Sequence, residues 1–151
     1  MRAINHSLTG ALIGLTVVDP LLAVPLAFAS HYVMDGLPHF GQGKDKPILN
    51  SKSFIGMLIV DTILCILLVT VIAIYRPSHW LMAIICAFVA ASPDLFSIKK
   101  FYAALKGIPW KPNLYIRFAN KIQWFERPIG AVVEIVWLVS FVFCLSFFIR
   151  R

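Results

Sequence analysis

Three long apolar runs constrain the fold of this chain more than any other feature. They extend over residues 53–75, 79–98 and 128–149, and a helix needs roughly 20 apolar residues to cross the hydrocarbon core of a bilayer. Hydrophobic residues make up 60% of the 151 residues and charged residues only 14%, whereas soluble domains carry about 25% charged residues. The surplus apolar side chains must face lipid, so the sequence predicts an all-α integral membrane protein.

The first 40 residues predict a helical hairpin over residues 3–37. Its turn lies at Val18-Asp19-Pro20, because a residue before proline avoids the helical conformation. One arm extends from Ala3 to Val18 and the other from Pro20 to about Gly36. The expected architecture is a single transmembrane domain over residues 1–151: this hairpin, a second hairpin over 53–98, an interfacial segment over 99–127 and a last span over 128–149. That gives about five helices besides the interfacial one.

The interfacial segment mixes basic and aromatic residues, a pattern typical of a helix lying in the head-group layer. Asn113 is expected to cap a helix from Leu114 to about Glu126. Membrane lipids are the expected partners, through charge-assisted hydrogen bonds to anionic head groups. Nucleic acid is not expected, because the basic residues flank apolar spans. The predicted head-group contacts are Lys99, Lys100, Arg117, Lys121 and Arg127.

The distribution of lysine and arginine predicts the orientation in the membrane. Eleven of the 14 fall on one side, comprising the seven of the interfacial segment with Arg2, Lys44, Lys46 and Lys52. The other three are Arg76, Arg150 and Arg151. The positive-inside rule therefore predicts a cytoplasmic N-terminus and an external C-terminus.

Histidines and acids recur near the cytoplasmic ends of the predicted helices. His6 and His31 are equally far from the first turn, so an antiparallel pair places them at the same depth. Asp35 follows His31 on the same helical face, at i+4. His39 comes directly after Pro38, where the helix should have ended, and is expected to fold back toward the others.

The other helices carry acids at similar positions. Asp61 and Asp94 are equally far from the second turn, between Pro77 and Ser78. Asp94 follows Pro93, where a break can turn its carboxylate inward. Glu126 and Glu134 share one face of the last helix at i and i+8. The remaining Asp19, Asp45 and His79 are explained by turn chemistry or interfacial solvation.

We expect these eight groups to converge on one site. Insertion of an isolated charge near the bilayer centre costs roughly 3 kcal/mol of free energy, and groups that meet can neutralise one another. A divalent cation, either one or two ions, neutralises them. Histidine and carboxylate ligands without cysteine favour Zn²⁺, Mn²⁺ or Fe²⁺ over Mg²⁺, and a two-metal site of this kind favours phosphoester hydrolysis. Two alternatives remain: polar helix ends solvated at the interface, and a proton or ion relay in a non-enzymatic membrane protein.

Two motifs, His6-Ser7-Leu8-Thr9-Gly10 and His31-Tyr32-Val33-Met34-Asp35, resemble the membrane-bound metal-dependent hydrolase family, of the inner-membrane YdjM type. Asn5 stands where that family has threonine, and Ser92-Pro93-Asp94-Leu95 gives half of its Pro-Asp-x-Asp-His element, in a different order along the chain. The resemblance implies a metal site built from His6, His31, Asp35 and Asp94. It also implies a bacterial inner-membrane location.

The resulting hypothesis is a metal-dependent hydrolase at the cytoplasmic membrane face, acting on a phosphoester or lipid-linked substrate. His39, Asp61 and Glu134 would complete a second metal site or support the first. Glu126 is the candidate general base, because it lies closest to the aqueous edge, and Asp94 is expected at the reacting centre.

Overall fold

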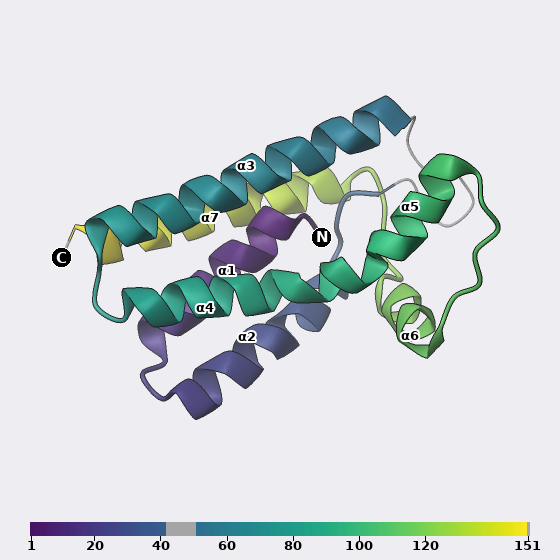
Figure 1. Ribbon diagram of the computed structural model, residues 1–151. Coiled ribbons are helices and arrows are strands. Elements are labelled where there is room, and N and C mark those ends of the chain that lie inside the picture. The colour runs from purple at the N-terminus through teal and green to yellow at the C-terminus, as the bar shows by residue number, and fades with distance from the viewer. Residues whose placement is uncertain (42–50, 151) are drawn as a thin grey trace.

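A computed structural model describes residues 1–41 and 51–150, which fold into helices joined by turns (Figure 1). The all-α prediction is confirmed for these residues. Lys44, Asp45, Lys46 and Arg151, which entered the sequence analysis, lie outside the described residues.

The predicted N-terminal hairpin is confirmed. Helix α1 (Ala3–Thr16) and helix α2 (Pro20–Asp35) are joined by a three-residue turn, and the Asp19 carboxylate caps α2 by accepting a hydrogen bond from the Leu21 N–H at 2.9 Å. At 1.5 Å per residue, the 14 and 16 residues of these helices extend only about 21 and 24 Å. Both fall short of the roughly 30 Å hydrocarbon core.

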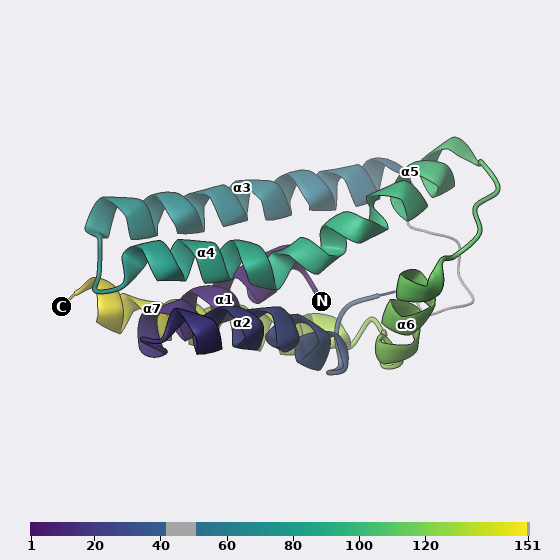
Figure 2. The same ribbon diagram turned by 60° about the horizontal axis from the view of Figure 1, so that its bottom comes forward.

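Three helical segments are long and apolar enough to cross a membrane: Ile55–Tyr75, Trp80–Ala103 and Gly130–Ile149. The first lies in α3 (Ser51–Tyr75) and the third is α7 (Gly130–Ile149). In Figures 1 and 2, α3, α4 (Trp80–Ala91) and α7 extend along the length of the molecule, and α1 is inclined to them. Their outward side chains are large and apolar, including Ile66, Phe88 and Phe143.

The second of these segments changes conformation at the predicted proline break. Helix α4 (Trp80–Ala91) continues into a 3-10 helix, η1 (Ser92–Ser97), and then into α5 (Ile98–Lys106). Pro93 has no N–H to donate to the α-helical ladder. The tighter 3-10 turn carries Asp94 in its first turn.

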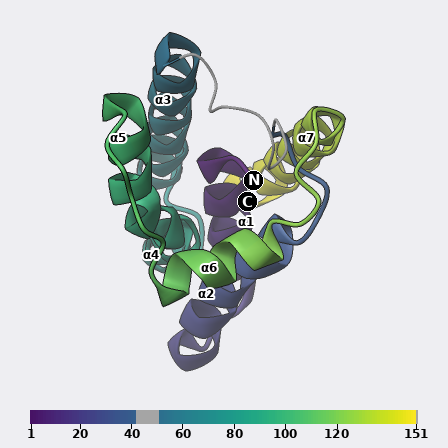
Figure 3. The ribbon, with the colours of Figure 1, turned by 90° about the vertical axis from the view of Figure 1, so that its right-hand side faces the viewer.

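Helix α6 (Leu114–Ile122) begins as expected, because the Asn113 side chain accepts a hydrogen bond from the Ile116 N–H at 2.9 Å. It ends at Ile122 rather than near Glu126. The following residues instead pair with the segment after α2: Glu126 forms an isolated parallel bridge with His39, and the Arg127 N–H donates to the His39 carbonyl at 3.1 Å. Figure 3 shows α6 lying across the end of the bundle.

Helix α1 lies at the centre of the bundle because its glycines allow very close packing against α4. A Cβ added to Gly10 would collide with the Cys86 carbonyl, and one added to Gly14 with the Met82 carbonyl. Spacing of small residues at i and i+4 is how helices approach one another closely in membranes. This contact brings the N-terminal end of α1 alongside η1, where the candidate site lies.

Candidate metal centre

His6 of α1 and His31 of α2 lie face to face at the open end of the N-terminal hairpin. Their ring centroids are 4.0 Å apart and the ring planes differ by 25°. Both side chains are buried. The sequence predicted that His6 and His31 lie at the same depth, because they are equally far from the turn. The structure brings their side chains together.

The hydrogen bond of His31 determines which ring nitrogen carries a hydrogen. Its Nδ1 lies 2.8 Å from the Ala90 carbonyl oxygen, which can only accept, so Nδ1 must be the donor. In the neutral ring, Nε2 then presents a lone pair. It faces Asp35 Oδ2 at 3.4 Å and Asp94 Oδ1 at 3.8 Å. A lone pair facing two carboxylates is unfavourable unless a metal ion or a proton lies between them. A backbone carbonyl on the far nitrogen is one of the usual supports of a metal-ligating histidine.

His6 has no hydrogen-bond partner at either ring nitrogen, although its side chain is 0% exposed. Its Nε2 lies 3.3 Å from Asp35 Oδ1, without hydrogen-bonding geometry. Buried polar atoms are nearly always hydrogen-bonded, and each exception calls for an explanation such as an ion. A metal ligated by one of its ring nitrogens would explain why His6 has no hydrogen-bond partner.

Asp94 completes the group from η1. One ligand atom each from His6, His31 and Asp94 lies within 4.8 Å of the other two. The Asp94 side chain is 38% exposed, whereas those of the two histidines are at most 4% exposed. The group is therefore closed on the helix side and open at Asp94, as in catalytic zinc sites that keep one position for water or substrate.

Asp35 lies between the two imidazoles and is linked to α6. Its Oδ2 accepts a hydrogen bond from Gln123 Nε2 at 2.8 Å, and its Oδ1 also contacts the Met1 amino group. Asp35 is not one of the three residues whose ligand atoms converge. Its two oxygens lie 3.3 Å from His6 Nε2 and 3.4 Å from His31 Nε2.

Helix α6 is fixed across this site at two points. Besides the Gln123 contact, the Tyr115 hydroxyl donates to the Pro93 carbonyl at 3.0 Å, next to Asp94. Burial raises the pKa of Tyr115, so the hydroxyl stays protonated and remains a donor. These contacts place a basic helix beside the open edge of the metal group.

The structure places Asp61 and Glu134 with the N-terminal segment rather than with the two histidines. Asp61 Oδ1 accepts a hydrogen bond from Arg2 Nε at 3.0 Å. Glu134 Oε1 accepts from the Arg2 N–H at 3.2 Å and from the Phe40 N–H at 3.3 Å. Both carboxylates therefore already have partners that bind α1 to α3 and α7.

His39 and Glu126 form a third location, at the bridge between the segment after α2 and the segment before α7. His39 Nδ1 donates to the Leu37 carbonyl at 2.8 Å, and burial lowers the pKa of His39. The Glu126 side chain lies against Gly41, where an added Cβ would collide with it. Among the described residues, the group with converging ligand atoms includes neither His39 nor Glu126.

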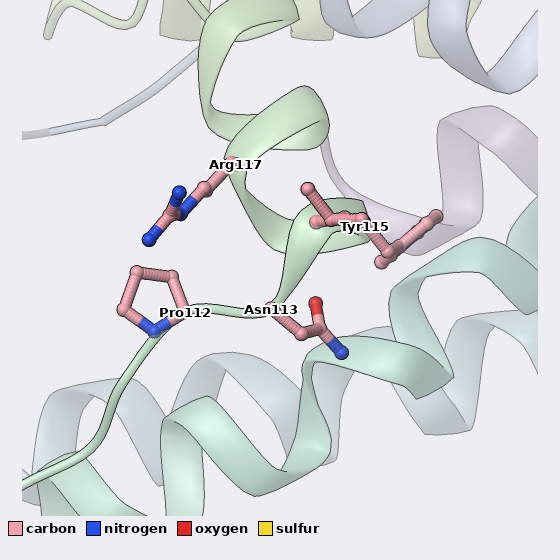
Figure 4. A pocket seen from close by; sticks show the side chains of 5 residues that line it. Pro112, Asn113, Tyr115 and Arg117 are labelled. Atoms are coloured by element: carbon pink, nitrogen blue, oxygen red, sulfur yellow. The ribbon is translucent and has the colours of Figure 1, made fainter.

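The predicted head-group residues lie at the α5–α6 end of the molecule. Lys99, Arg117, Lys121 and Arg127 are exposed, while Lys100 donates to Asn120 Oδ1 at 3.1 Å. An open cavity of about 550 Å³ lies at the start of α6, with Arg117 on its rim and Tyr115 on its wall (Figure 4). A positively charged, aromatic surface thus lies on the same helix that contacts the metal group.

Sequence reasoning missed the roles of Arg2 and Asn5. Arg2 was counted only for topology, and Asn5 only as a departure from a motif, yet Asn5 is buried and its Nδ2 donates to the Glu134 carbonyl at 3.2 Å. The signal that could have identified Asn5 is an amide in the first turn of an apolar helix, directly before His6.

No protein-family model matches the sequence, and comparisons with curated proteins and with solved structures give no match.

Proposed function

We propose that this chain is an integral membrane protein that hydrolyses a phosphoester, on a lipid or lipid-linked substrate, with a divalent metal at His6, His31, Asp35 and Asp94. The observation that carries the proposal is the buried pair of imidazoles. His6 has two unpartnered nitrogens, and Nε2 of His31 faces two carboxylates. One divalent cation would bind one ring nitrogen of His6, Nε2 of His31 and the carboxylates that face them.

The donor set suits Zn²⁺, Mn²⁺ or Fe²⁺, because imidazole and carboxylate ligands without sulfur favour these ions. When bound, such an ion lowers the pKa of a water ligand and stabilises negative charge on a phosphoryl oxygen. His6 and His31 would hold the ion from the helix side, and Asp94 from the open edge. Asp35, whose oxygens face Nε2 of both rings, would be a further ligand. The Ala90 carbonyl, by fixing Nδ1–H of His31, leaves its Nε2 available to the ion.

The basic side chains of α6 give the proposal a substrate class. Arg117 and Lys121 are exposed on a helix that is linked to Pro93 and Asp35 through Tyr115 and Gln123. Anionic phosphate oxygens bind such side chains by charge-assisted hydrogen bonds. In the reaction, water oxygen bonds to phosphorus, the bond from phosphorus to the lipid oxygen breaks, and that oxygen takes up a proton. Glu126, the general base expected from the sequence, lies at the bridge with His39 and outside the converging group, so we assign it no step.

The proposed location is the cytoplasmic face of a bacterial inner membrane. It rests on the charge distribution, on the three segments long enough to cross and on the position of α6 at the end of the bundle that carries most lysine and arginine residues. In this orientation the metal group opens toward the cytoplasm.

A second candidate function is proton handling without hydrolysis. A proton on His31 Nε2 also satisfies Asp35 and Asp94, because a doubly protonated imidazole donates from both nitrogens. This alternative gives neither ring nitrogen of His6 a hydrogen-bond partner, although Nε2 lies 3.3 Å from Asp35 Oδ1. A metal would bind a ring nitrogen of His6 directly, and we therefore prefer the metal.

The hydrolase proposal is tested by incubating purified protein with phosphatidic acid in mixed micelles and measuring release of inorganic phosphate. We expect release that requires added Zn²⁺ or Mn²⁺, stops with excess chelator and falls at least about 100-fold in Asp94→Asn. His79→Asn is the matched control, because His79 is exposed at the far end of α4 with a positive φ of 63° that asparagine tolerates. Metal binding without phosphate release from any lipid phosphate would refute the hydrolase and leave ion handling.

A further inference from the structure

A second cavity, of about 330 Å³, lies on the other side of α1 from the two histidines. It is lined by residues of α1, α3 and α7, with Phe40 from the segment after α2, and it is partly open to the outside. Figure 3 shows α1 between α3 and α7 when the bundle is viewed end on. Its walls are mostly apolar, formed by Ile4, Phe40, Met57, Leu64, Ile135 and Leu138. Its volume is at the small end of the range for ligand pockets.

Two of the polar residues that line this cavity, which together form its polar part, have side-chain atoms without hydrogen-bond partners. Asn5 is 1% exposed, and its Oδ1 accepts no hydrogen bond although its Nδ2 is bound to the Glu134 carbonyl. Arg2 donates from Nε to Asp61, but its buried Nη2 donates to nothing. Both residues line the cavity. An acceptor and a donor are thus left in the polar part of a mostly apolar space.

The charges around this polar part disfavour an anionic ligand. The Arg2 guanidinium is already paired with Asp61, and the Glu134 carboxylate lines the same space. A neutral hydroxyl fits better, because it can donate to Asn5 Oδ1 while it accepts from Arg2 Nη2. The apolar walls then surround a hydrocarbon chain. Ile135 on one wall is itself exposed at the outer surface of α7, so a chain can enter from the lipid side.

We propose that this cavity binds an acyl lipid with a neutral hydroxylated head, of the monoacylglycerol class. The hydroxyl group lies at Arg2 and Asn5, and the acyl chain lies between α3 and α7. This site is separate from the metal group and requires neither a metal nor turnover.

The probe for this site is a medium-chain monoacylglycerol added to the full-length protein in an amine-oxide detergent, which carries no hydroxyl group. Native mass spectrometry counts bound lipid and gives its apparent affinity. We expect one bound monoacylglycerol, and binding at least about 10-fold weaker for the fatty acid and the acylglycerol phosphate of equal chain length.

Two variants locate the binding. Asn5→Leu keeps the side-chain volume but removes the acceptor, together with the Nδ2 donor to the Glu134 carbonyl. We expect about 10-fold weaker binding. Ala131→Phe fills the cavity from α7 and should abolish binding while the protein remains monodisperse and keeps its melting temperature. Asn120→Leu makes the same chemical change as Asn5→Leu on α6 and should bind like the unmodified chain.

Three outcomes would overturn the proposal. The first is absence of bound monoacylglycerol, which would mean that the polar part holds only water. The second is equal binding of the anionic lipids, which would refute the neutral head. The third is unchanged binding in a folded Ala131→Phe protein, which would place the lipid elsewhere.

Discussion

At the scale of single residues, backbone carbonyls and amides decide what the polar side chains can do. The Ala90 carbonyl fixes the hydrogen on His31 Nδ1, and the Phe40 and Arg2 amides occupy Glu134 Oε1. The two side chains, a histidine and a glutamate, therefore differ in what they can still bind. One presents a free lone pair to the site, whereas the other is already used to join segments of the chain.

Sequence reasoning predicted part of this arrangement. Counting residues from the turn was sufficient to pair His6 with His31, because an antiparallel hairpin fixes relative depth. Counting residues from the second turn wrongly placed Asp61 in the same site as the histidines. Its carboxylate is bound by Arg2, a long flexible side chain whose direction no helical periodicity specifies. Likewise, the partner amide of Phe40 depends on how an irregular segment folds back, and local sequence patterns do not determine that.

Gln123 provides a test at this scale. Its amide donates to Asp35 Oδ2 at 2.8 Å, and loss of an outer partner of this kind typically lowers metal affinity about 10- to 100-fold. We expect Gln123→Leu to bind metal at least about 10-fold more weakly in a chelator competition assay. Asn120→Leu, three residues earlier on α6, should retain the original affinity. Equal affinity of the two variants would remove Asp35 and Gln123 from the metal site.

At the scale of helices, the chain was largely predictable because proline, asparagine and apolar length determine where each helix begins and ends. The turn at Asp19-Pro20, the break at Pro93 and the cap at Asn113 are all confirmed. The end of α6 was predicted too late. No proline or glycine near Ile122 ends that helix. Four residues further on, Glu126 pairs with His39, a residue distant in the sequence.

The packing of α1 on α4 was not predicted, although its signal, Gly10-x-x-x-Gly14, stands in the sequence. We expect Gly10→Ala to destabilise the protein by about 1–3 kcal/mol, because overpacking forces the two backbones apart. Thermal unfolding in detergent measures the effect. Gly56→Ala is the matched control, since nothing lies within 4 Å of its added Cβ, and it should be neutral or slightly stabilising. Equal effects of the two changes would contradict the close α1–α4 contact.

At the scale of the whole molecule, the metal group, α6 and the basic residues gather at one end of the bundle. The turn between α3 and α4 and the end of α7 lie at the other (Figure 1). Eleven of the 14 basic residues belong to the first end by the topology derived from sequence. The basic surface therefore lies next to the metal group. An anionic substrate would bind this positive surface beside the open edge at Asp94.

The orientation is tested by a protease-sensitive tag placed after Arg151 in spheroplasts of a bacterial host. The positive-inside rule predicts cleavage of that tag by added protease. The same tag inserted after Gly107, in the basic connection between α5 and α6, should be protected until the membrane is lysed. The reverse pattern would place the metal group at the external face.

The central claim is that a divalent cation neutralises the buried imidazoles and carboxylates, and metal analysis of the purified protein tests it most directly. We expect about one or two Zn, Mn or Fe ions per chain by inductively coupled plasma mass spectrometry. Content should fall to background in a folded His6→Ala/His31→Ala protein and stay unchanged in His79→Asn. Two results would contradict the account. One is a metal content at background in the unmodified protein after reconstitution with each ion. The other is an equal metal content in the unmodified, His6→Ala/His31→Ala and His79→Asn proteins.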